Sequence, residues 1–169
     1  MAAKKYFLYA VVFVFISMIT QALLIAFVPN IIFAIAKQRS GKPLNTVIHA
    51  PATDAKLRKV VLPNPDFIYS AVFYDISDGD LHITAQFPDS SQYASMAFYD
   101  TKTQPYFVMN NMESGKENVD IILSVTGKGA NIVHSPTSQG VVLMRFLVKD
   151  SSMATPTFKL QKLFRVEKM

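Results

Sequence analysis

The pattern of apolar and polar positions divides the chain into two parts. Residues 6–36 carry no charged side chain, and the polar residues that interrupt this run are Ser17, Thr20, Gln21 and Asn30. Roughly 20 apolar residues cross a bilayer core about 30 Å thick, whereas a helix over this whole run would reach about 46 Å. The pattern therefore predicts a tail of residues 1–5, followed by one long transmembrane helix over residues 6–36 that extends beyond the bilayer core.

A cleaved secretory signal is the main alternative for this segment. Lys4 and Lys5 would provide its positive start, and Ala34-Ile35-Ala36 fits a small-residue cleavage site. The apolar part of a signal peptide, however, takes only about 7–15 residues. The length of the run therefore favours an anchor that stays attached.

The remainder of the chain carries the signals of β-strands. Residues 37–59, with Gly41 and Pro43, are expected to form a linker, and residues 60–169 a β domain with its own core. Residues 81–87 alternate apolar and polar side chains, as a half-buried strand does. Further strands are predicted at residues 67–74, 93–99, 119–125 and 141–148, with turn sequences between them. The fold class is therefore mainly β, an antiparallel β-sandwich or barrel-like domain preceded by the helix.

The C-terminal residues 156–166 fit two kinds of element. Phe158, Leu160, Phe164 and Val166 alternate as in a strand, whereas Leu160, Leu163 and Phe164 would share one face of a helix. We expect a short helix here.

Charge is divided unevenly along the sequence. All acidic residues lie from Asp54 onward, where basic residues balance them, so the net charge of +5 belongs to the segments that flank the helix. The basic residues there are Lys4, Lys5, Lys37, Arg39 and Lys42. Such clusters attract anionic lipid headgroups, so the expected partner is the bilayer and not a nucleic acid. With two basic residues before the helix and three after it, the charge bias mildly opposes a cytoplasmic N-terminus.

Three polar side chains inside the apolar run predict association of the helix. Ser17, Thr20 and Gln21 stand at positions i, i+3 and i+4, so they share one face. An amide in hydrocarbon is costly unless it is hydrogen-bonded, and such side chains join helices. We expect a homo-oligomer, such as a trimer, held together by this face. Ser17 and Thr20 could instead bond to their own helix, Pro29 could bend the helix, and a different protein could satisfy Gln21.

Several sequence blocks in the β domain resemble a known family. Asn64-Pro65-Asp66-Phe67-Ile68-Tyr69-Ser70, followed by Asp75-Ile76, is similar to the signature of the bacterial domain of unknown function 1254 family. The later blocks keep the family's order: Phe87-Pro88-Asp89, Gln92-Tyr93, Ser135-Pro136-Thr137, the strand through Arg145 and Leu160-Gln161. Pro65 and Gln92 stand where the family usually has arginine, so an anionic site built on those arginines is not expected here.

The resemblance implies a β-sandwich-like domain of exported or envelope proteins, with no agreed activity. We expect a minimal, membrane-tethered version without the family's second domain. We also expect a single-pass protein of the bacterial inner membrane with its β domain in the periplasm. A long C-terminal domain can translocate despite the weak opposing charge bias.

Six residues of the β domain form a candidate pocket: Asn64, Asp66, Tyr69, Asp75, Tyr93 and Arg145. A buried carboxylate among them could bind a ligand or act as a base. The structural alternative is that Asn64 and Asp66 form an Asx-type turn that enters a strand, while Tyr69 caps an edge of the core. Arg145 lies in a run that is otherwise uncharged, so we expect an ion pair with Asp66 or Asp75.

The sequence offers no further chemistry-bearing motif. His49, His82 and His134 have no partner at zinc-ligand spacing, there is no cysteine, and no nucleophile elbow or nucleotide-binding loop occurs. No metal or cofactor is expected. We expect a non-enzymatic, membrane-anchored envelope protein that assembles through its helix and contributes to envelope organisation or the permeability barrier. The alternative is a membrane-tethered hydrolase or small-ligand-binding enzyme with an Asp66/Tyr69 pocket.

Overall fold

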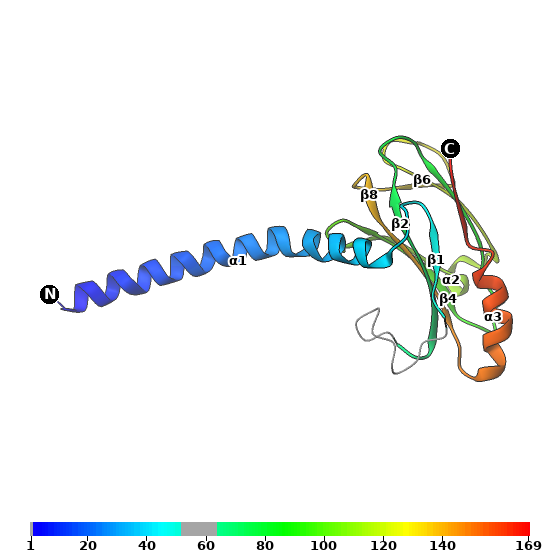
Figure 1. Ribbon diagram of the computed structural model, residues 1–169, viewed down its shortest axis with the longest axis horizontal. Helices are drawn as coiled ribbons and strands as arrows, with labels where there is room; N and C mark the ends of the chain where they lie inside the picture. The colour runs from blue at the N-terminus through cyan, green and yellow to red at the C-terminus, as the bar shows by residue number, and fades with distance from the viewer. Residues whose placement is uncertain (1, 52–63) are drawn as a thin grey trace.

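A computed structural model describes residues 2–51 and 64–169 of the chain. A long helix leads into a domain of two β-sheets packed face to face, with the helix entering the domain at one end (Figure 1). The predicted arrangement, a sandwich-like β domain behind a long apolar helix, is confirmed.

Helix α1 spans Ala2–Ser40 and is apolar on all sides over most of its length. It is long and apolar enough to cross a membrane, and its apolar window is fully exposed in the described structure. The helix continues through Pro29, which lacks the N–H donor of an ordinary helical residue. Because α1 reaches Ser40, the first residues of the predicted linker, 37–40, are helical.

The first sheet has five antiparallel strands in the order β1-β2-β8-β4-β5. The strands are β1 (Val47–His49), β2 (Phe67–Asp75), β8 (Gln139–Leu147), β4 (Ala94–Asp100) and β5 (Pro105–Asn110). Buried and half-buried residues alternate along β2 and β8, so one side of each strand faces the core. The predictions for β2, β4 and β8 were right to within two residues, whereas β1 lies inside the segment expected to be linker.

The second sheet has four strands in the order β7-β6-β3-β9. They are β7 (Ile132–His134), β6 (Asn118–Ser124), β3 (Leu81–Gln86) and β9 (Arg165–Lys168). β7 runs parallel to β6, so this sheet is mixed and corrects the prediction of a purely antiparallel domain. The parallel pair arises because the chain from β6 turns back across residues 125–131 before it rejoins the same edge.

Three short helical segments complete the fold: α2 (Asn111–Ser114), the 3-10 helix η1 (Ser151–Met153) and α3 (Ala154–Gln161). The expected short helix is present as α3, and strand β9, which was not predicted, follows it. Gln161 is buried and its amide donates to the carbonyls of Ala50 and Tyr69 at 3.0 and 2.8 Å. This contact fixes α3 against the end of β2.

The core lies between the sheets and is built from the inward-facing side chains of both. Fully buried members include Tyr74, Phe98 and Phe146 from the first sheet and Leu81 and Leu123 from the second. Packing is tight at Gly140, where a Cβ atom would lie 2.2 Å from both the Tyr74 hydroxyl and the Tyr99 carbonyl oxygen. The β domain thus has a well-packed core of its own, distinct from the exposed part of α1.

Candidate functional site

The C-terminal part of α1 is docked onto the outer face of the five-stranded sheet. Phe33 is only 5% exposed, and its ring meets that of Phe73 on β2 edge to face, with centroids 5.8 Å apart. The Lys37 ammonium lies 6.0 Å from the centroid of the Phe33 ring and donates to the Gln139 side-chain oxygen at 3.3 Å. Both contacts use one side of the helix, because positions 33 and 37 are one turn apart.

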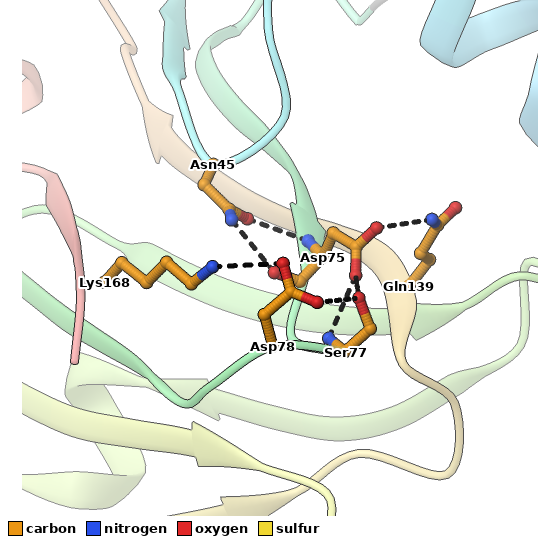
Figure 2. A network of polar contacts seen from close by, with 6 residues as sticks. All are labelled: Asn45, Asp75, Ser77, Asp78, Gln139 and Lys168. Carbon is orange, nitrogen blue, oxygen red and sulfur yellow. Dashed lines mark hydrogen bonds and ion pairs between the residues drawn. The ribbon is translucent and has the colours of Figure 1, made fainter.

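From Gln139 a polar network continues to the C-terminal strand (Figure 2). The Gln139 amide donates to the Asp75 carboxylate at 2.6 Å, and the same carboxylate accepts from the Ser77 hydroxyl and N–H at 2.6 and 3.0 Å. The Ser77 hydroxyl also contacts Asp78, which pairs with Lys168 at 3.3 Å. These contacts join the ends of β2, β8 and β9 near the C-terminal end of α1.

Asp75 is the centre of this network. The hydrogen bonds from Ser77 lower the pKa of its carboxyl group, and weaker contributions come from Gln139 and Lys37, while partial burial opposes them. Asn45 binds the Asp75 backbone on both sides, accepting from its N–H at 2.8 Å and donating to its carbonyl at 2.9 Å. Asp75 is therefore held as an ionised structural residue where the chain leaving α1 meets β2.

The other predicted pocket residues lie toward the opposite end of β2. Tyr69 pairs with Arg145 across β2 and β8, while Asp75 pairs with Gln139, so the two positions are about 20 Å apart along the strands. The Arg145 Nε donates to the Ser95 hydroxyl at 2.6 Å, and its guanidinium lies over the Phe67 ring. The expected ion pair of Arg145 with Asp66 or Asp75 is not formed. Ser95, opposite Arg145 on β4, supplies the polar partner instead.

Asn64 and Asp66 form the turn that enters β2. The Asn64 side-chain oxygen accepts from the Asp66 N–H at 2.9 Å, which is an Asx turn. The Asp66 carbonyl accepts from Val148, and Tyr93 likewise accepts from Leu147 through its backbone. The structure thus brings Tyr69 and Arg145 together, with Asn64 and Asp66 at the neighbouring turn, and separates Asp75 from them.

The helix residues singled out by sequence lie on exposed parts of α1. Lys4 and Lys5 lie near the start of the helix. Arg39 is exposed in its last turn, and Lys42 is exposed just after it. Ser17, Thr20 and Gln21 are exposed as well. A groove is lined by Lys102 and Gln104 of the turn between β4 and β5 and by six residues of α1: Gln21, Leu24, Ile25, Ala26, Val28 and Pro29.

Sequence reasoning missed a buried hydroxyl cluster between the sheets. The Tyr74 hydroxyl contacts those of Tyr106 at 2.9 Å and Ser135 at 2.8 Å, and Ser135 donates to the Thr137 carbonyl. Burial raises the pKa of both tyrosines, so they stay protonated at neutral pH and join the two sheets rather than react. The Ser135-Pro136-Thr137 block was the available signal, but nothing in the sequence pointed to Tyr74 or Tyr106.

Buried amides form a second set that the sequence did not reveal. The Asn111 amide donates to the carbonyls of Pro88, Asp89 and Gln92, and its oxygen accepts from Ala94. Gln92 donates to the Leu147 carbonyl and to the Thr157 hydroxyl. Within residues 2–51 and 64–169, no group of three His, Cys, Asp or Glu side chains could hold a metal ion.

Comparisons with known proteins agree with this architecture. The profile of the family described as "Protein of unknown function (DUF1254)" matches residues 44–168. No curated protein matches the chain. The VPA0106 protein from Vibrio parahaemolyticus has a similar solved structure, with a TM-score of 0.66 and 11% identity over 83% of this chain. A second similar structure, of an uncharacterized protein from Burkholderia cenocepacia, has a TM-score of 0.54 and 16% sequence identity over 81% of this chain. This chain spans only 34% and 40% of the lengths of those two chains.

Proposed function

The chain belongs to the DUF1254 family, and from this premise we propose that it is a non-enzymatic, membrane-anchored protein of the cell envelope. It assembles through α1 and contributes to envelope organisation or to the permeability barrier. One observation carries the proposal: α1 is apolar on all sides and exposed over most of its length, yet its last turns are docked on a β domain with a packed core. A helix of this kind is stable in lipid and not in water.

The contact made by Lys37 bears on orientation. Of the three basic residues after the apolar run, Lys37 is half-buried and binds Gln139 of the domain, which leaves Arg39 and Lys42 exposed. Because the acceptor is a neutral amide, Lys37 keeps its charge and the weak bias of three basic residues against two stands, but a long C-terminal domain can translocate despite such a bias. We therefore propose a single-pass inner-membrane protein with a periplasmic β domain.

A reporter fused after Met169 tests this orientation. Active alkaline phosphatase and a dark cytoplasmic fluorescent protein are the expected pair of results. The opposite pair would place the β domain in the cytoplasm and overturn the proposal.

Self-association is supported by the face of α1 that lies opposite the docked residues Phe33 and Lys37. Six exposed residues recur at alternating spacings of four and three: Ser17, Gln21, Leu24, Val28, Ile31 and Ile35. At 100° per residue this stripe lies opposite Phe33 and Lys37, so the docking contacts leave Ile31 and Ile35 free, while Gln21, Leu24 and Val28 also line the groove beside the turn between β4 and β5. Ile31 and Ile35 are 54% and 43% exposed although they lie level with the docked part of the helix. A second and third copy of α1 would cover this stripe in the manner of a coiled coil.

The test is the mass of the detergent-purified protein across a wide concentration range. We expect an oligomer such as a trimer for the wild type, and at least about tenfold weaker association for Ile31→Gln/Ile35→Gln and for Gln21→Leu. Ala36→Gln is the matched control, because Ala36 is exposed but lies off the stripe. A wild-type monomer at every concentration would rule out assembly through α1.

The contribution to the envelope is tested by deletion. A strain without the protein should take up a normally excluded dye faster, and the wild-type gene should restore the barrier while the Ile31→Gln/Ile35→Gln variant should not. Normal uptake in the deletion strain would contradict the barrier role. The alternative of an enzyme with an Asp66/Tyr69 pocket remains a hypothesis that no observation on the described residues favours.

A further inference from the structure

The docking of α1 limits which residues can lie in lipid. This step rests on the proposed membrane anchor. Phe33 is buried against Phe73 and Lys37 binds Gln139, so the helix around them lies against protein. Lys5 marks the other limit. Counting about 20 residues from Lys5 places the far boundary of a 30 Å core near Ile25.

The turn between β4 and β5 lies at this same level of the helix. Lys102 and Gln104 line the groove with residues that flank Ile25, from Gln21 to Pro29. The calculated membrane boundary and the position of the turn beside α1 are independent, since the boundary comes from the length of the apolar run and the position comes from the fold. Along the axis of α1, the boundary and the turn lie within about one helical turn of each other.

Hydrogen bonds to Asp100 hold the turn between β4 and β5 in a fixed conformation. The Asp100 side chain is buried and accepts from the N–H groups of Lys102 and Gln104 at 2.8 and 2.9 Å. The Thr103 N–H donates to the Asp100 carbonyl at 3.0 Å. The acidic residue of the turn is thus used internally, while Lys102 is exposed and is the sole basic residue between β4 and the end of β5.

The outer face of the five-stranded sheet lies just beyond this level. Phe33, where the helix touches the sheet, is about eight residues past Ile25, or roughly 12 Å along the axis. The headgroup layer on each side of a bilayer is about 5–8 Å thick. In Figure 1 the helix approaches the β2 and β8 layer from its outer side, so this layer is nearer than the other sheet to the membrane.

We propose that the β4–β5 turn rests in the headgroup layer of the membrane that α1 crosses, with Lys102 contacting the phosphates of anionic lipids. The outer face of the five-stranded sheet then faces the bilayer, and the four-stranded sheet faces the aqueous compartment. The domain is held in one orientation rather than swinging on a tether, because both the helix contacts and the turn fix it.

Labelling at single positions tests the arrangement, since the chain contains no cysteine to remove. Phe15→Cys, Lys102→Cys and Asn118→Cys each receive an environment-sensitive fluorophore in the full-length protein. The proteins are reconstituted in vesicles of phosphatidylcholine and phosphatidylglycerol that carry nitroxide quenchers, either on the headgroup or at the centre of the acyl chains. Asn118 is exposed at the start of β6 in the four-stranded sheet and serves as the control.

The expected pattern separates three depths. The label at position 15 is quenched from the acyl centre, the label at 102 from the headgroup, and the label at 118 from neither. If position 102 behaves like 118 while 15 is quenched, the turn does not touch the membrane and this inference is overturned, although the anchor stands. If position 15 is not quenched, the anchor itself is refuted, and the inference falls with it.

A charge reversal tests the role of the lysine. In a Gln104→Cys background, Lys102→Glu should reduce headgroup quenching at least about twofold in the anionic vesicles and leave it nearly unchanged in pure phosphatidylcholine. Lys116→Glu, at an exposed lysine beyond α2, is the matched control and should have no effect. Equal quenching in Lys102→Glu and wild-type proteins would refute the contact with lipid phosphates.

Discussion

The outer faces of the two sheets differ in the side chains they present. On the four-stranded sheet the outward residues are largely polar or charged, as in His82, Thr84, Asp120 and Glu167, with Ile122 and Ile132 as apolar exceptions. On the five-stranded sheet they are largely apolar, in two adjacent rows: Phe67, Tyr69, Ala71 and Phe73 on β2, and Val141, Leu143 and Leu147 on β8. The apolar face is the one that receives α1. A sheet face in water is normally polar, so this difference indicates which side of the domain packs against α1.

The largest expected effect comes from breaking the core that both faces share. A methyl group at position 140 would overlap the Tyr74 hydroxyl and the Tyr99 carbonyl oxygen, and a backbone atom cannot move aside easily. Gly140→Ala should therefore destabilise the β domain by about 3 kcal/mol or more. Thermal unfolding in detergent measures this loss of stability. Gly129→Ala, whose Cβ would meet only the end of the Ile132 side chain, should change stability by less than about 1 kcal/mol. Equal losses of stability in Gly140→Ala and Gly129→Ala would show that the close packing at position 140 is not the cause.

A second substitution sharpens the comparison at the apolar face. Phe33→Ala and Phe73→Ala each remove one ring of the contact that joins α1 to β2. Each should cost about 1–2 kcal/mol, and the double variant should cost less than the sum by about 0.5–1.5 kcal/mol. Both should also speed tryptic cleavage after Arg39. Thr84→Ala, on the polar face, should alter neither readout, and strict additivity of the two phenylalanine changes would refute the contact.

The polar network behind that contact predicts a dependence on pH. The pKa of Asp75 is lower in the folded protein than its ordinary value of 3.8, because the ionised carboxylate accepts hydrogen bonds from Ser77. A group of this kind contributes stability that is fully present above pH 3.8 and is lost as the pH falls through the lowered value. Asp75→Asn should therefore be less stable than the wild type near neutral pH, and the difference should shrink below pH 3.8. A constant difference across the titration would exclude the ionised form as its cause.

Local patterns were sufficient to predict the main strands of the domain. Leu81 to Gln86 alternates apolar and polar residues, and Phe67 to Tyr74 is a run rich in β-branched and aromatic residues, so both spans were recovered almost to the residue. β5 was missed because its exposed edge position removes the alternation, and β7 and β9 were missed because they are short. The parallel pairing of β7 was beyond reach, since it depends on how a turn reverses in space and not on periodicity.

The candidate site was less predictable, for a physical reason. Asn64 and Asp66 act within a few residues of each other, so the alternative of an Asx turn could be stated from the sequence. Arg145 hydrogen-bonds Ser95, and Asp75 hydrogen-bonds Gln139, across neighbouring strands. Such pairs depend on strand order and register. The sequence places a charge in a strand but does not indicate which strand lies beside it.

The smallest expected effect lies on the polar face. His82 on β3 and Asp120 on β6 are diagonal neighbours on the outer face, with the imidazole Nε2 2.9 Å from the carboxylate, and both side chains are partly exposed. Water screens such a pair and ordering its side chains costs entropy, so its net contribution is small. Asp120→Asn should change the free energy of unfolding by less than about 0.5 kcal/mol. Chemical denaturation at low and high salt measures it, with Thr84→Ala on the same face as the reference. A loss as large as that of Phe73→Ala would mean that the polar face also carries a structural contact, and the distinction between the two faces would then fail.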